Sequence, residues 1–155
     1  MRRQLPGTVV NAVRVLVALV VLGGVTTVLM WVRADDLILS WGRGNAAASE
    51  ILEEGGLAAL KESPIVPSFV PVAIVSFVMF AMLALVLGVF FVEGHNWARI
   101  SLSATVVFGL LLSVITVGYD LPGLFVGCVV VGALLCLAEL FFLWHKATNA
   151  YIRDL

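Results

Sequence analysis

The sequence has little charge for its length. Only 12% of its 155 residues are charged, which is about half the share found in a soluble domain, whereas 62% are hydrophobic and the mean hydropathy is +1.13. Folded in water, such a chain would expose most of its apolar surface, which excludes an ordinary soluble globular protein and a disordered chain. The net charge of −1 supplies no basic surface for nucleic acid either.

The residues that usually carry catalysis or metal binding are also scarce. The two cysteines, Cys128 and Cys136, lie eight residues apart on one expected helix, too far to form a disulfide with each other. His95 and His145 are both expected at the cytoplasmic face, but no acid or thiol completes a ligand set with them. The sequence contains no glycine-rich phosphate loop and no nucleophile elbow. We therefore expect no enzymatic activity, no cofactor and no metal.

Long apolar runs are what the sequence does have. About 20 predominantly apolar residues cross the hydrocarbon core as a helix, because every backbone amide must be paired there. We interpret the first run, which follows Met1-Arg2-Arg3, as an uncleaved anchor because it is longer than a signal-peptide core. The sequence thus predicts an all-α fold, a single transmembrane domain that forms a four-helix bundle. Its predicted spans are residues 9–32, 68–92, 100–119 and 121–144, with an outer loop over 33–67 and a cytoplasmic tail over 145–155.

The basic residues predict the orientation of this bundle. The loop 33–67 carries three basic residues against six acidic ones. The opposite side carries six basic residues, Arg2, Arg3, Arg14, Arg99, Lys146 and Arg153, against Glu93, Asp154 and the intramembrane Glu139. Because cytoplasmic loops are enriched in basic residues, we expect both termini in the cytoplasm. Aromatic residues are expected to anchor the two interfaces: Trp31 and Tyr119 outside, Trp97 and Trp144 inside.

The loop 33–67 is expected to form a helical cap on the outer side. Residues 46–54 read as a short helix with Asn45 as its N-cap, Gly55-Gly56 interrupts it, and 57–62 can form a further turn. Residues 37–41 are too apolar for a free loop, so the segment should lie over the outer ends of the bundle. Two interpretations remain: a surface that faces a partner or substrate, or a solvated linker.

Small residues recur at helical spacing along the third and fourth spans. In membranes such stripes mark the faces along which helices pack closely, although the hydroxyl groups would also suit a pore lining. The predicted packing stripe consists of Ser101, Thr105, Gly109, Ser113 and Thr116 in the third span and Cys128, Gly132 and Cys136 in the fourth.

One acid and one base lie within the spans. Arg14 in the first span and Glu139 in the fourth are expected at similar depth near the cytoplasmic boundary, on antiparallel helices. The structural interpretation is an ion pair that fixes the first helix against the fourth, with Asn11 adding a hydrogen bond. In the functional interpretation, Glu139 is a proton or cation site in a transporter. A third interpretation is a pair with a partner protein.

Two short motifs give the chain a resemblance. One is Leu5-Pro6-Gly7-Thr8-Val9 leading into the first span, and the other is Gly94-His95-Asn96-Trp97-Ala98-Arg99 between the second and third spans. With its four spans and larger first outer loop, the whole chain resembles small four-pass inner-membrane proteins of high-GC Gram-positive (actinobacterial) bacteria. The resemblance implies a bacterial inner-membrane location and carries no activity with it.

These observations favour a non-enzymatic role. We expect an accessory or interaction subunit that acts through its helix faces and outer loop. Its surroundings would be the lipid bilayer and a membrane-protein partner or a second copy of the chain. The alternative is a small transporter or channel subunit that uses Glu139 and the Ser/Thr face of the third span.

Overall fold

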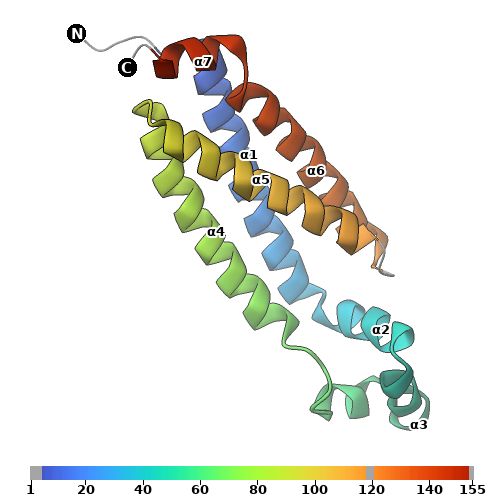
Figure 1. Cartoon of the computed structure of the whole chain (residues 1–155). Helices are drawn as coiled ribbons and strands as arrows, with labels where there is room; N and C mark the ends of the chain where they lie inside the picture. The colour runs from blue at the N-terminus through green and yellow to red at the C-terminus, as the bar shows by residue number, and fades with distance from the viewer. Residues whose placement is uncertain (1–4, 118–120, 154–155) are drawn as a thin grey trace.

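The protein is built entirely from helices in the part of the chain that the structure describes. A computed structural model describes residues 5–117 and 121–153, which form seven α-helices and no strand (Figure 1). Four helices are long and apolar enough to span a membrane: α1 (Gly7–Val32), α4 (Phe69–Val92), α5 (Asn96–Val117) and α6 (Gly123–Leu143). The all-α prediction is confirmed, and these four helices lie within a few residues of the predicted spans.

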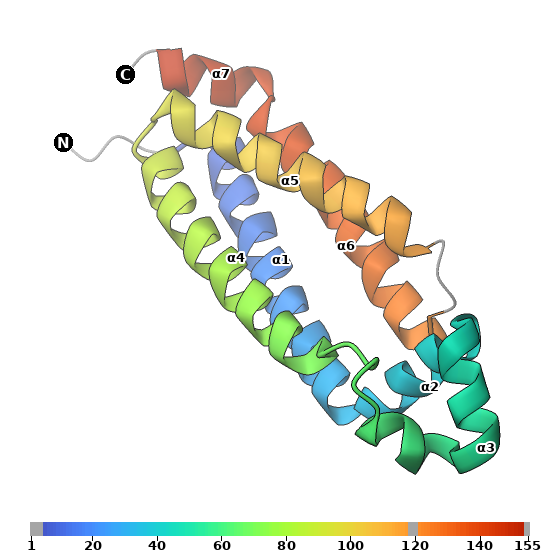
Figure 2. The same ribbon diagram turned by 60° about the horizontal axis from the view of Figure 1, so that its bottom comes forward.

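The four long helices pack as a bundle in which each has two neighbours. Helix α1 packs against α4 and α6, and α5 packs against the same two helices from the other side. Two views show α4 and α5 close together at one end and farther apart at the other (Figures 1 and 2). Small residues bring α1 and α4 close: a Cβ built on Gly88 would lie 3.2 Å from Leu16 Cδ2, and one on Gly24 would lie 3.2 Å from Phe77 Cζ.

Three shorter helices lie at the ends of the bundle. Helices α2 (Ala34–Gly44) and α3 (Ala46–Glu62) follow α1 at one end, which we call the cap end. Helix α7 (Lys146–Arg153) follows α6 at the other, which we call the α7 end (Figure 2). The start of α1 lies at the α7 end as well, because the Thr148 hydroxyl on α7 is hydrogen-bonded to that of Thr8 at 2.9 Å.

The helical cap has the local features predicted for it. The Asn45 side chain accepts a hydrogen bond from the Ala48 amide at 3.2 Å, which caps α3. Gly56 has φ 68°, a conformation that L side chains rarely adopt, and it kinks α3 where the sequence predicts an interruption. An ion pair of 2.7 Å between Lys61 Nζ and Asp35 Oδ1 joins α3 to α2.

The buried core lies mainly in the half of the bundle near α7. It comprises Val9, Ala12, Leu16, Ala84, Leu87, Phe91, Ala98, Leu102 and Leu143. Outside this core the long helices expose large apolar side chains, among them Val114 on α5 at 74% and Leu85 on α4 at 69%. Because no water-facing surface tolerates this much apolar area, the chain is a multi-pass membrane protein with lipid around α1, α4, α5 and α6.

Two segments differ from the sequence-based expectation. The turn between α4 and α5 is shorter than predicted, because α5 already begins at Asn96. Gly94 makes this turn with φ 89°. Residues 145–155 were predicted only as a tail, yet residues 146–153 form α7, which folds back onto the bundle.

Candidate functional site

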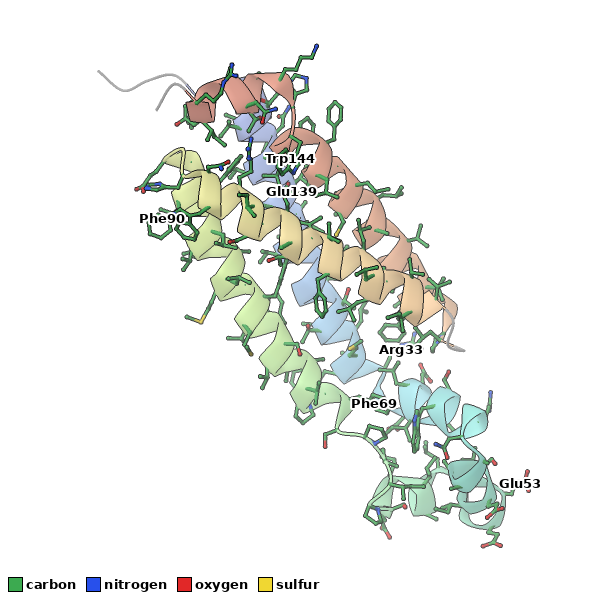
Figure 3. The ribbon with its side chains drawn as sticks, in the orientation of Figure 1. Arg33, Glu53, Phe69, Phe90, Glu139 and Trp144 are labelled. Atoms are coloured by element: carbon green, nitrogen blue, oxygen red, sulfur yellow. The ribbon has the colours of Figure 1, made fainter. Side chains whose placement is uncertain are left out.

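Glu139 lies on the inner face of α6, in the half of the bundle near α7 (Figure 3). The buried residues Cys136 and Leu143 precede and follow it by about one turn on the same face. Its side chain is 0% exposed, and neither carboxyl oxygen has a hydrogen-bond partner. An isolated carboxyl group in an apolar interior is costly, so Glu139 is the least satisfied side chain of this core.

The predicted ion pair between Arg14 and Glu139 is not formed. Arg14 is exposed, and its Nη1 donates a hydrogen bond of 3.4 Å to Asn11 Oδ1 on the same helix. Helix α1 turns Ala12 and Leu16 into the bundle. Arg14 lies two residues beyond Ala12, about 200° around the helix, and therefore faces outward. From that face a long basic side chain can extend to the lipid headgroups.

The two halves of the predicted packing stripe meet at Gly109 and Cys136. A Cβ built on Gly109 of α5 would lie 3.8 Å from Cys136 Sγ of α6, so these positions face each other. Gly132 instead faces α1, because its Cβ would lie 3.5 Å from Leu22 Cδ2. Cys128 is half-buried with a free thiol.

Three of the four hydroxyl groups in the α5 stripe are bonded within their own helix. Thr105, Ser113 and Thr116 each donate to the carbonyl oxygen four residues earlier, at 2.9, 2.8 and 2.7 Å. Ser101 provides the carbonyl that Thr105 uses, and its own side chain is half-buried. These three donors are therefore already occupied, which weakens the pore-lining interpretation.

The aromatic anchors lie near the ends of the long helices. Trp31 is 69% exposed near the end of α1, and Trp97 is 48% exposed at the start of α5. Trp144 directly follows α6. Tyr119, the fourth predicted anchor, lies outside the described residues.

Arg99 and Trp144 form a polar cluster at the α7 end that the sequence does not predict. The Arg99 guanidinium lies 4.4 Å from the centroid of the Trp144 ring, a cation–π contact, and its Nη1 donates to Asn149 Oδ1 on α7. The Trp144 indole donates to Ser103 Oγ at 2.9 Å, while Arg99 Nε is buried without a partner. The cluster joins the start of α5, the end of α6 and α7.

Helix α7 is held to the bundle by further hydrogen bonds. Thr148 is fully buried and donates to the Phe142 carbonyl of α6 at 2.8 Å, besides its bond to Thr8 of α1. The Tyr151 hydroxyl donates to the Val92 carbonyl at the end of α4 at 2.7 Å. Counting the Arg99 bond from α5, α7 contacts all four long helices.

An apolar groove runs along the outside of the bundle between α1 and α4. Its volume is about 590 Å³. Residues Ala81, Ala84 and Gly88 of α4 line it at helical spacing, and the exposed side chains of Val17 on α1 and Leu85 on α4 flank it. Ala84 is buried and Gly88 faces Leu16 of α1, so these small residues form the floor of the groove where α1 and α4 pack, and the exposed apolar side chains form its rim.

No protein-family model, no curated protein and no solved structure matches this chain. Within residues 5–117 and 121–153, no group of three or more His, Cys, Asp and Glu side chains is arranged to hold a metal ion.

Proposed function

We propose that the chain is a non-enzymatic accessory subunit of a membrane assembly and that it binds a transmembrane helix of a partner protein in the groove between α1 and α4. The observation that carries this proposal is the groove itself, which has exposed apolar side chains from α1 and α4 along its rim, Val17 and Leu85 among them. Helices associate in membranes by close packing, so a groove with this lining favours a helix as its occupant.

The orientation that we propose places the α7 end in the cytoplasm. In the described residues, Arg14, Arg99, Lys146 and Arg153 lie in the half of the bundle near α7. The exposed acids Glu50, Glu53, Glu54 and Glu62 belong to α3 at the cap end. This distribution supports cytoplasmic termini by the positive-inside rule, and it leaves an acidic cap on the opposite side for a partner's extramembrane part. We retain the plasma membrane of a bacterium as the proposed location.

A transporter that uses Glu139 is the second candidate. The unpartnered carboxyl group favours it, since intramembrane acids without a structural partner often bind protons or cations. Against it, Glu139 is fully buried, so ions would reach the carboxyl group only after a rearrangement of the bundle. The groove needs no such rearrangement, and we therefore rank the accessory role first.

The accessory role is tested by placing a photo-crosslinking amino acid at position 17 or 85 in the native membrane. Both side chains are exposed and both line the groove. We expect one defined adduct whose mass exceeds that of the chain by the mass of a partner protein. An adduct of twice the chain mass would identify a second copy as the occupant and would replace the partner proposal.

The matched control uses Val114 on α5, which is exposed but lies outside the groove. We expect Val17→Trp, which fills the groove, to abolish the adduct formed from position 85, whereas Val114→Trp leaves it unchanged. Equal crosslinking from positions 17, 85 and 114, or adducts with lipid alone, would contradict a helix-binding groove.

A further inference from the structure

A second pocket lies at the α7 end, between the start of α5 and α7. Its volume is about 550 Å³. The polar side chains that line it are Asn96 and Arg99 of α5 and Lys146, Asn149 and Arg153 of α7. No acidic side chain lines the pocket among the described residues. Within the described part of the chain, three positive charges and two amides therefore surround a cavity that no acidic side chain lines.

The basic side chains of this pocket are available to a ligand. Lys146 and Arg153 are exposed, and no hydrogen bond or ion pair within the described residues involves either side chain. Arg99 is held in place by Trp144 and Asn149; Nε is buried and one Nη1 donor is bonded to Asn149, so the other N–H groups of the two Nη atoms remain for further acceptors. A fixed guanidinium beside two flexible basic groups suits an anion with several acceptor oxygens, as a phosphate has.

The position of the pocket along the membrane normal points to the source of this anion. Trp97 follows Asn96 at the start of α5, and Trp144 comes directly after the last residue of α6. Both indoles are about half exposed, as is typical of tryptophans at the level of the lipid headgroups. The pocket is lined by Asn96 and Arg99 beside Trp97 and by α7, which begins two residues after Trp144, so it opens near the depth where phospholipid phosphates lie.

We propose that this pocket binds the phosphate of an anionic phospholipid headgroup. Arg99 and the exposed Lys146 and Arg153 contact the phosphate oxygens, and the amide groups of Asn96 and Asn149 provide further donors. Basic pockets between transmembrane helices commonly bind anionic headgroups in this way. The bound lipid bridges α5 and α7 and so stabilises α7 on the bundle. This proposal does not depend on the partner helix proposed for the groove.

The test is a titration of the purified full-length chain in a non-ionic detergent, followed by native mass spectrometry. The probes are dioleoyl phosphatidylglycerol, which is anionic, dioleoyl phosphatidylcholine, which is zwitterionic, and inorganic phosphate. The test variant is Lys146→Gln/Arg153→Gln, and the control variant Arg43→Gln/Lys61→Gln removes the same charge at the cap end. Circular dichroism verifies that each variant is folded. If the double variant does not fold, Arg153→Gln alone replaces it.

We expect phosphatidylglycerol to bind more tightly than phosphatidylcholine. Each basic group near an anionic lipid surface contributes to the binding free energy. Removing two of them should therefore weaken the binding of phosphatidylglycerol by at least about tenfold. The control variant should bind it as the parent chain does. Equal affinities for the two lipids, or equal loss in the test and control variants, would overturn the proposal. Saturable binding of inorganic phosphate that displaces phosphatidylglycerol would retain the phosphate site but overturn the lipid as its source.

Discussion

Arg14 and Glu139 show what a single residue's position in the sequence determines and what it does not. Depth follows from the sequence, because each helical residue rises by about 1.5 Å. Direction around the helix depends on which face packs, and in α1 that face is set by Val9, Ala12, Leu16 and Leu19. Arg14 points away from this face, so two charges at similar depth do not meet. The spacing of the small and apolar residues in α1 is compatible with this buried face. Only the contacts of α1 with α4 and α6 show which face is buried.

At the residue scale we predict that Glu139→Leu stabilises the protein. Removing a buried polar group that has no partner should raise the free energy of unfolding by about 1–3 kcal/mol, measured by unfolding in detergent micelles. Glu139→Gln should give no such gain, because it leaves a buried polar group in place. Arg14→Gln should change stability by less than about 0.5 kcal/mol, because its side chain is exposed.

The opposite result would support the structural interpretation, in which Arg14 and Glu139 form an ion pair. If Arg14→Gln and Glu139→Leu each destabilised the protein and their effects were strongly non-additive, the two side chains would be in contact in the membrane. Loss of ion-coupled uptake into liposomes on Glu139→Gln, with unchanged stability, would favour the transporter over the accessory role.

At the element scale, the cap and α7 differ in how far the sequence predicts them. The N-cap at Asn45 and the break at Gly56 depend on residues within one or two turns, so local patterns are sufficient. Helix α7 depends on bonds from Thr148 to Thr8 and from Tyr151 to Val92, which lie 140 and 59 residues apart in the chain. No local pattern contains those contacts, so the sequence predicts only a cytoplasmic tail here, although its residues can form an amphipathic helix.

The attachment of α7 can be tested through Thr148. Thr148→Val keeps the shape of a fully buried side chain but removes its bonds to Thr8 and to the Phe142 carbonyl. We expect a loss of about 1–3 kcal/mol in local stability, seen as faster amide hydrogen exchange over residues 146–153. The control is Thr116→Val, which removes one hydrogen bond within α5 and should leave exchange in α7 unchanged. Unchanged exchange in Thr148→Val would show that α7 is held by other contacts.

At the scale of the whole molecule, hydrophobicity determines the environment of the chain. The four long helices expose apolar side chains on their outer faces and bury a modest core between them. Lipid therefore covers most of the apolar surface that the bundle does not bury. The number of spans and their approximate ends follow from apolar length alone, which is why the sequence predicts them well. The order of packing around the bundle and the groove between α1 and α4 depend on the geometry of pairs of helices, which length and composition do not specify.

We expect the four spans to place the cap on one side of the membrane and α7 on the other. Single cysteines at Ala47 in α3 and Ala147 in α7, both exposed, test it in a chain that carries Cys128→Ala and Cys136→Ala. We expect a membrane-impermeant maleimide to label Ala47→Cys on intact cells and Ala147→Cys only after the membrane is permeabilised. Labelling of both cysteines from the same side of the intact membrane would contradict the four-span arrangement.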